Sequence, residues 1–210
     1  LQNHLRPDQV RVVGLPVADR FCQPPGDKSA LQQRLGWRQD LPMVLLVGGG
    51  EGMGPLKKIA RAIAEADLKV GLAIITGRNH QLRQRLEAYP WARDVHIYGF
   101  MRNMPEMMAA ADILITKAGP GTISEALNAG LPMILYSRLP GQEDGNVSYV
   151  VDEGAGVWAP QVEQVLSSLE TWLESPDLLA RASQACYRLA RPRAARDIAH
   201  ILAETIGITA

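Results

Sequence analysis

Short apolar runs alternate with longer amphipathic stretches along most of the chain. The runs are rich in Val, Ile or Leu, and most are bounded by Gly, Pro or Asp. Runs of this kind are typical of strands that are buried on both faces of a parallel sheet. We therefore predict strands at Val10–Val13, Met43–Val47, Val70–Ile75, Val95–Tyr98, Ile113–Thr116 and Met133–Tyr136.

Helical patterns separate these runs and continue after the last one. Between the strands they lie at Lys28–Leu35, Leu56–Ala66, Gln81–Ala88, Pro105–Ala110, Thr122–Asn128 and Asn146–Glu153. The tail, residues 161–210, adds Val162–Leu173, Pro176–Leu189 and Ala194–Thr205. This alternation predicts an α/β fold, a Rossmann-like parallel sheet wrapped by helices, with a helical tail. Ligands bind such sheets outside the carboxyl ends of the strands, so the loops after the strands are the candidate sites.

Length and charge limit the classes of function. The chain has 210 residues, which suits a single large domain, and 22 Lys and Arg balance 22 Asp and Glu. A net charge of zero gives no global basic field, so we predict no nucleic-acid partner. Cys22 and Cys186 have no metal or redox spacing, and we expect reduced thiols in a cytoplasmic protein. No apolar run reaches the length of a membrane span.

The loop Gly48–Pro55 lies between a predicted strand and a predicted helix and holds five glycines. Glycines remove side chains where a ligand approaches the backbone, and they permit positive φ. The free N–H groups of such a loop can hold anionic oxygens. No Gly-Lys-Ser/Thr follows, so this is not a Walker motif. A mobile turn is the alternative, but a turn needs only one or two glycines.

A second loop, Lys117–Glu125, also joins a predicted strand to a predicted helix. Gly119 and Gly121 open the helix start, where free N–H groups and the helix dipole favour a phosphate. Glu125 lies one turn further and can accept hydrogen bonds from a ribose diol. However, Thr122 and Glu125 also match the capping-box pattern, which alone would explain both residues. The two interpretations stay open, and they are compatible with each other.

The third loop, Pro140–Asn146, places polar side chains between glycines. Gln142 and Glu143 suit the hydroxyl groups of a sugar, and Asn146 is placed to cap the next helix. A solvated loop explains this composition equally well.

A fourth loop, Gly99–Met101, follows the strand that ends at Tyr98. An aromatic ring beside free backbone groups can hold a flat base by stacking and hydrogen bonding. From the pattern alone, a core position is the more common role for Phe100.

No acid, base or nucleophile accompanies these loops. His80, His96 and His200 are scattered, and none pairs with a carboxylate at ligand spacing. The chain lacks Ser-His-Asp, HExxH and CxxC arrangements. The sequence therefore predicts a phosphate-holding site without an evident catalytic base and without a metal site.

Three segments together resemble a known family. They are GGGEGMGP at 48–55, TKAGPGTISE at 116–125 and GQEDGN at 141–146. In this order they resemble the monogalactosyldiacylglycerol synthases, within the wider glycosyltransferase family 28. The resemblance extends from about residue 10 to residue 157, and Gly99-Phe100 and Val13–Val17 fit it as well.

The resemblance implies the C-terminal, donor-binding half of a GT-B glycosyltransferase. It places the lipid acceptor and the catalytic base in an N-terminal domain that precedes this sequence, with residues 1–10 as the end of the linker. The implied UDP-sugar site has the uracil beside Phe100 and the ribose on Glu125. The diphosphate faces Gly121 and Thr122, and the sugar faces Gln142 and Glu143. The full set of implied binding residues is Gly49, Gly50, Glu51, Gly52, Met53, Gly54, Phe100, Met101, Gly119, Pro120, Gly121, Thr122, Glu125, Gln142, Glu143 and Asn146.

The implied activity is inverting transfer of galactose or glucose from UDP-galactose or UDP-glucose to diacylglycerol, which makes a glycolipid. The resemblance implies no cofactor beyond the donor and peripheral association of the full-length protein with a membrane. One alternative is a transferase that uses UDP-N-acetylglucosamine. Another is a UDP-sugar epimerase of the same fold, although these loops lack the carboxylates and histidine that it needs. A non-catalytic nucleotide-sugar-binding domain is the third.

Overall fold

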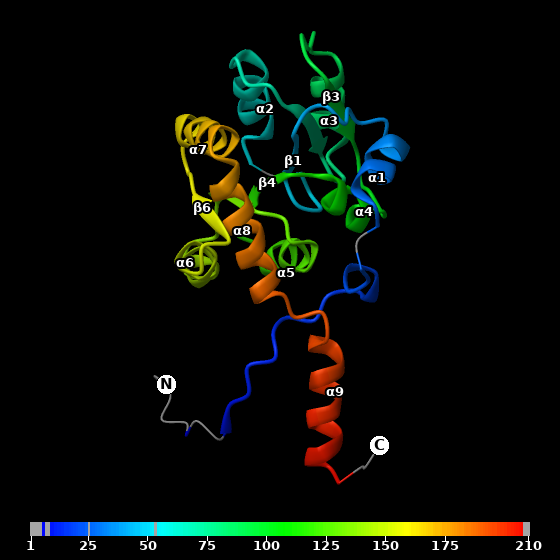
Figure 1. The fold of residues 1–210 in the computed structure, drawn as a ribbon, viewed down its shortest axis with the longest axis vertical. Coiled ribbons are helices and arrows are strands. Elements are labelled where there is room, and N and C mark those ends of the chain that lie inside the picture. The colour runs from blue at the N-terminus through cyan, green and yellow to red at the C-terminus, as the bar shows by residue number, and fades with distance from the viewer. Residues whose placement is uncertain (1–5, 7–8, 25, 53, 208–210) are drawn as a thin grey trace.

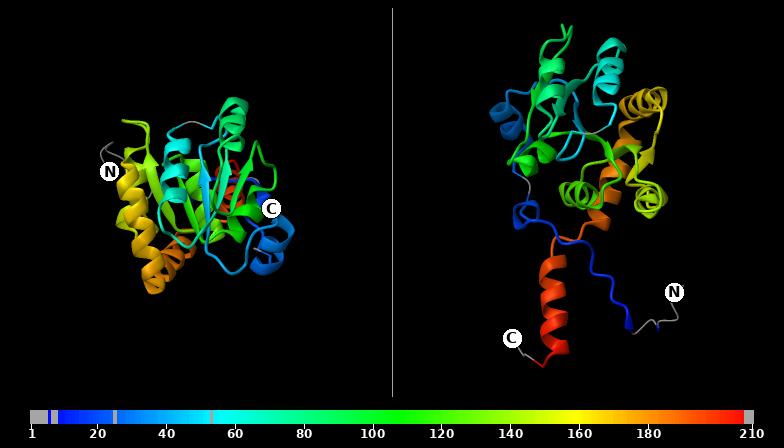
Figure 2. Two further views of the ribbon diagram at one scale, coloured as in Figure 1. Left: turned by 90° about the horizontal axis from the view of Figure 1, so that it is seen from above. Right: turned by 180° about the vertical axis from the view of Figure 1, so that it is seen from behind.

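The computed structural model describes residues 6, 9–24, 26–52 and 54–207. In this part of the chain a parallel sheet of six strands has the order β3-β2-β1-β4-β5-β6 and is covered by helices on both faces (Figure 1, Figure 2). The strands are β1 Met43–Val47, β2 Gly71–Ile75, β3 Val95–Tyr98, β4 Ile113–Lys117, β5 Met133–Ser137 and β6 Gly156–Trp158. The predicted α/β fold is confirmed.

Every predicted helix is present, with ends displaced by at most two residues. The helices are α1 Lys28–Leu35, α2 Leu56–Glu65, α3 His80–Glu87, α4 Met104–Ala110, α5 Pro120–Ala129, α6 Asp144–Asp152, α7 Val162–Glu174, α8 Pro176–Leu189 and α9 Ala194–Thr205. A short 3₁₀ turn, η2 at Asp19–Phe21, precedes them. None of the helices in the described ranges is long and apolar enough to cross a bilayer.

The sheet separates two apolar layers, as strands buried on both faces require. In β1, Met43, Leu45 and Val47 face the layer that contains α1, α4 and α5. Val44 and Leu46 face the opposite layer, which contains α2 and α7. All five side chains of β1 are buried, so this strand is the centre of the core.

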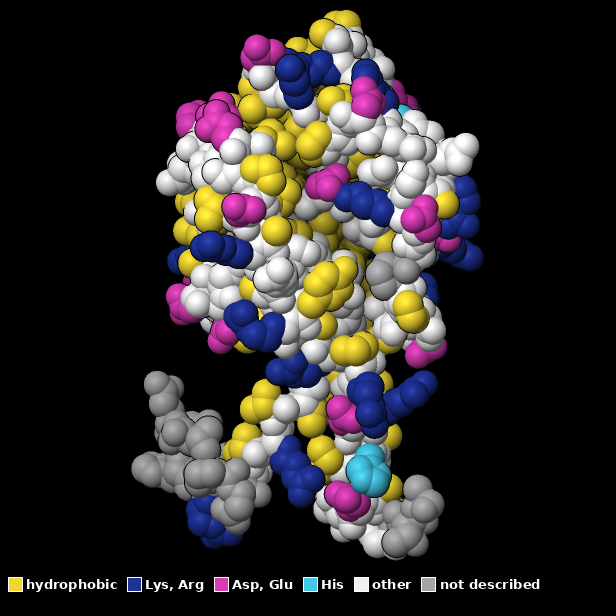
Figure 3. Space-filling model, in the orientation of Figure 1, with side chains coloured by type: hydrophobic (Ala, Val, Ile, Leu, Met, Phe, Trp, Pro, Cys, Tyr) yellow, Lys and Arg dark blue, Asp and Glu magenta, His cyan; other side chains and the backbone are white. Residues whose placement is uncertain are grey.

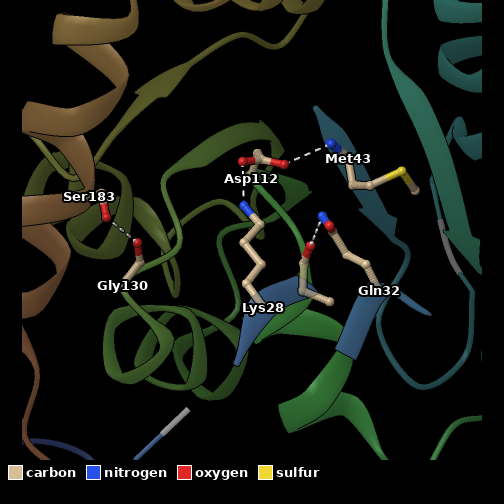
Figure 4. A network of polar contacts seen from close by, with 7 residues as sticks. Lys28, Gln32, Met43, Asp112, Gly130 and Ser183 are labelled. Atoms are coloured by element: carbon tan, nitrogen blue, oxygen red, sulfur yellow. Dashed lines mark hydrogen bonds and ion pairs between the residues drawn. The ribbon is translucent and has the colours of Figure 1, made fainter. Parts of the chain in front are cut away.

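Polar contacts fix the start of the sheet against α1 (Figure 4). Asp112 accepts a hydrogen bond of 2.8 Å from the backbone N–H of Met43 and forms an ion pair with Lys28. Gln32 is buried and donates to the Ala110 carbonyl oxygen at 3.0 Å. These contacts join α1, β1 and the turn before β4, and so they hold the strands whose far ends carry the candidate site.

One predicted strand is wrong and one strand was not predicted. Val10–Val13 forms no strand, and Val12 is 89% exposed. This segment lies away from the sheet, beside α9 (Figure 1). The strand that was not predicted is β6, at one edge of the sheet. Its three residues are too few for a recognisable apolar run. A Cβ on Gly156 would lie 2.3 Å from the Met133 carbonyl oxygen, so glycine permits this close strand pair.

Candidate functional site

The loops after β1 to β4 surround a cavity of about 310 Å³. The strand order reverses between β1 and β4, and ligand crevices form at such a switch point. Seven of the predicted binding residues line the cavity: Gly49, Gly50, Phe100, Met101, Gly121, Thr122 and Glu125. Seven further lining residues were not identified from the sequence: Arg20, Phe21, Val47, Ile75, Gly77, Met104 and Met108.

The unpredicted lining residues had different sequence signals. Arg20 and Phe21 belong to η2, which lies outside the strand–loop–helix units where ligands were expected. Phe21 is only 7% exposed, so it forms a fixed wall. Met104 and Met108 are one turn apart on α4, and this spacing was the signal available for a helix face turned toward the site.

Three glycines of the Gly48–Pro55 loop are needed by the fold itself. A Cβ on Gly48 would lie 2.5 Å from Leu56 Cδ1, and one on Gly52 would lie 2.1 Å from the Thr76 carbonyl oxygen. A Cβ on Gly54 would lie 2.8 Å from the Tyr136 ring. These glycines therefore let the loop pack against α2, the end of β2 and β5, a role that the glycine pattern alone did not predict.

The other two glycines of this loop, Gly49 and Gly50, line the cavity. The nearest atoms to an added Cβ are 3.7 Å away in both cases, at Lys117 Cε and Arg78 Nη1. Glu51 is exposed, forms an ion pair of 2.8 Å with Arg78 and is not part of the cavity wall. Met53 lies outside the described residues.

Phe100 is a surface aromatic, so the core interpretation of this residue is wrong. Its side chain is 52% exposed, and the Arg78 guanidinium lies 4.7 Å from its ring centroid. Because Arg78 also pairs with Glu51, one cation connects the glycine loop to the aromatic ring. Phe100 also lines the cavity, where an aromatic ring can stack against a flat ligand, as predicted for the uracil.

The capping-box interpretation of Thr122 and Glu125 is also wrong. Helix α5 begins two residues earlier than predicted, with Gly119 at the N-cap and Pro120 in the first turn. No side chain caps this helix start. Thr122 therefore lies inside the first turn, where its backbone N–H is one of the free donors that the helix offers to the cavity.

Glu125 is a half-buried carboxyl group in the cavity wall. Burial raises its pKa to about 7, and the charge of Arg20 opposes this shift. Within the described residues, no hydrogen bond or ion pair engages the carboxyl group. Such a group costs free energy unless a ligand supplies donors.

The Pro140–Asn146 loop lies beside the cavity rather than in its wall. Glu143 is buried, its Oε2 accepts a hydrogen bond of 2.7 Å from Leu139 N–H, and its Oε1 would lie 3.9 Å from a Cβ on Gly119. Asn146 caps nothing, because α6 begins at Asp144; it donates to the Ala118 carbonyl oxygen at 2.8 Å. These contacts place the starts of α5 and α6 side by side.

Three further predicted residues of this region also lie outside the cavity wall. Gln142 is exposed, while Gly119 and Pro120 lie at the start of α5 next to the α6 side. Over the described ranges, no group of three or more His, Cys, Asp or Glu side chains could hold a metal ion.

The described residues form a parallel sheet, and the uncapped start of α5 lies where the strand order reverses. This arrangement is typical of the class of Rossmann-like ligand-binding domains. Residues 43–196 match the glycosyltransferase family 28 C-terminal domain. The chain belongs to this family.

The chain is 45% identical over 202 residues to the probable monogalactosyldiacylglycerol synthase 3, chloroplastic, of Oryza sativa subsp. japonica. The match covers 92% of this chain but 40% of that protein, so the chain spans about two fifths of its length. The relative's name agrees with the family resemblance of the three loop segments.

Two solved structures share the fold. Acinetobacter baumannii MurG superposes with a TM-score of 0.66 at 20% identity, over 94% of this chain and 58% of that one. Anabaena Alr3699/HepE in complex with UDP-glucose superposes with a TM-score of 0.62 at 19% identity, over 97% and 60%. The GT-B character of the predicted fold is thereby confirmed.

Proposed function

We propose that this chain is the donor-binding domain of a UDP-sugar-dependent inverting glycosyltransferase that makes a galactolipid from diacylglycerol. The family and the names of the relatives support the reaction class, and they favour galactose over glucose as the transferred sugar. The acceptor lipid and the base belong to the preceding part of the longer protein. That protein works at a membrane surface, from the cytoplasmic side, as a peripheral enzyme.

The main support for a nucleotide site is that the uncapped start of α5 and the carboxyl group of Glu125 line the same cavity. Gly121 lies inside α5 with ordinary helical geometry, and nothing lies within 4 Å of an added Cβ. Neither backbone conformation nor packing therefore requires glycine there, although glycine costs about 1 kcal/mol in a helix. Close approach of a ligand to the Gly121 and Thr122 N–H groups explains the glycine.

In the proposed complex, the uracil stacks on Phe100 and the ribose hydroxyls donate hydrogen bonds to Glu125. The diphosphate lies at the start of α5, where free N–H groups and the helix dipole favour negative charge. The sugar points toward Gln142 and Glu143.

During transfer, the acceptor oxygen bonds to the sugar C1 while a general base takes the acceptor's proton. The bond from C1 to the phosphate oxygen breaks, and its electron pair stays on the departing UDP. The N–H groups at the start of α5 stabilise this added charge.

Calorimetric titration of the chain with UDP, UDP-galactose, UDP-glucose and UDP-N-acetylglucosamine tests the proposal. We expect UDP and UDP-galactose to bind, with ADP as a control that binds more weakly because its base does not fit the same wall. A preference for UDP-N-acetylglucosamine would mean that this nucleotide sugar, and not UDP-galactose, is the donor. If no uridine nucleotide binds, the proposed site is wrong.

A Gly121→Ala variant is expected to be slightly more stable than the wild type and to bind UDP about tenfold more weakly. The methyl group removes the helix penalty of glycine, about 1 kcal/mol, but occupies the space of the phosphate. Thermal melting and calorimetry measure the two effects.

Gly145→Ala is the matched control for this variant. Gly145 has the same position in the first turn of α6, has nothing within 4 Å of an added Cβ, and lies outside the cavity wall. It should gain stability without a comparable loss of UDP affinity. Equal UDP affinity of Gly121→Ala and the wild type would contradict a phosphate at this helix start.

A further inference from the structure

Lys117 is a cation at the switch point of the sheet, and it is not among the predicted binding residues. It ends β4, directly before the loop that leads into α5. Its Cε lies 3.7 Å from the position of a Cβ on Gly49, so its side chain reaches the loop after β1. The crevice between the ends of β1 and β4 is where the strand order reverses.

A break in the sheet register sets the position of this residue. Thr116 pairs with Leu135, but Lys117 pairs with Ser137, so Tyr136 is the extra residue on β5. Irregularities of this kind re-aim side chains and are common next to active sites. The register shift therefore falls at the residue whose side chain extends toward the glycine loop.

The charge of Lys117 is not compensated within the described part of the chain. Lys28 pairs with Asp112, Arg78 with Glu51 and Arg138 with Asp144. Lys117, by contrast, takes part in no hydrogen bond or ion pair among the described residues, although its side chain is half-buried. A partly desolvated ammonium group without a counter-charge favours an anionic ligand.

We propose that the Lys117 ammonium group binds the diphosphate of the nucleotide sugar. This inference rests on the proposed function and adds to it a cationic side chain at the end of β4. The start of α5 supplies only partial charges and backbone donors, whereas Lys117, two residues before the N-cap Gly119, supplies a full charge.

The distinguishing property of this contact is its dependence on the number of phosphates. Uridine, UMP and UDP share the base and ribose contacts, but only the nucleotides present negative charge to Lys117. Calorimetric titration of the wild type and a Lys117→Gln variant with these three ligands isolates the contribution. Lys117→Arg keeps the charge, and Lys58→Gln removes a charge from an exposed lysine on α2.

We expect Lys117→Gln to bind UDP tenfold to about a hundredfold more weakly and to bind uridine as the wild type does. Its UDP affinity should also fall less steeply with added salt, because one ionic contact is gone. Lys117→Arg should keep most of the UDP affinity, and Lys58→Gln should keep all of it. Uridine affinity also reports that each variant is folded.

Two outcomes overturn the assignment. If Lys117→Gln binds UDP as tightly as the wild type, Lys117 does not contact the diphosphate. If the variant loses uridine and UDP affinity to the same extent, Lys117 shapes the cavity instead of binding phosphate. In contrast, a wild type that binds neither uridine nor UDP refutes the proposed function itself.

Discussion

A Gly52→Ala variant is expected to unfold at a temperature about 6–12 °C below that of the wild type. Gly52 has a positive φ of 57°, which costs a residue with a side chain about 1 kcal/mol or more. An added Cβ would also lie 2.1 Å from the Thr76 carbonyl oxygen and 2.8 Å from Asn79 Cβ. The combined cost is about 3 kcal/mol, since overpacking alone costs about 1–3 kcal/mol.

Thermal melting without ligand measures this effect, and Gly50→Ala is the matched control. Gly50 is two residues away in the same loop, has no positive φ, and has no atom nearer than 3.7 Å to an added Cβ. Its melting temperature should stay within about 2 °C of the wild type, because no packing or backbone strain is introduced. If both variants melt alike, the loop does not pack in the way that these distances indicate.

These two positions show what the sequence could and could not predict about the glycine loop. The pattern of strand, glycines and helix correctly placed the loop at the carboxyl end of β1. It could not divide the glycines between roles, because Gly52 and Thr76 meet only through the pairing of β1 with β2. The sequence does not distinguish the glycines that face the cavity from those that the fold requires, and Gly49, with a φ of 73°, belongs to both groups.

The predicted start of α5 was two residues too late because two sequence signals compete there. Thr122 and Glu125 have the spacing of a capping box, and this pattern moved the predicted start to Thr122. Pro120 was the stronger signal, because proline favours the first turn and indicates Gly119 as the N-cap. The contribution of η2 to the cavity could not be predicted, because it depends on how the segment before α1 packs against α5.

Surface charge agrees with the balanced composition. On the face shown in Figure 3, Lys and Arg side chains are interspersed with Asp and Glu, and neither sign forms a continuous patch. This face therefore offers no continuous basic patch that would attract a charged ligand, and groups inside the cavity matter more. Glu125 matters in this respect because its own charge state changes near neutral pH.

A Glu125→Gln variant is expected to bind UDP at least tenfold more weakly than the wild type at pH 8. The ionised carboxylate accepts hydrogen bonds from both ribose hydroxyls, and hydrogen bonds to charged groups are worth about 1.5–3 kcal/mol. The amide keeps the shape of the side chain but loses the charge. Calorimetry with UDP measures the loss, and Ser124→Ala, a neighbouring α5 residue outside the cavity wall, is the control.

The same substitution should stabilise the free protein at high pH. Burial raises the pKa of Glu125 to about 7, above the value of 4.5 for a free carboxyl group. The folded state therefore binds a proton that the unfolded state releases, and wild-type stability falls as pH rises from about 4.5 to about 7. Glu125→Gln lacks this titration. At pH 8 it should be more stable by about 1–2 kcal/mol, less than the full shift implies, because part of the carboxyl group stays hydrated.

Opposite changes in stability and affinity distinguish a binding role from a structural one. Thermal melting at pH 4 and pH 8, together with UDP affinity at pH 6 and pH 8, tests both in one set of variants. Wild-type affinity should rise with pH relative to Glu125→Gln, because only the wild type gains an acceptor charge through about pH 7. The comparison at each pH cancels the titration of the UDP phosphates, which both proteins share. A variant that melts lower than the wild type at pH 8 and binds UDP equally well would assign Glu125 to the fold and leave the ribose without its acceptor.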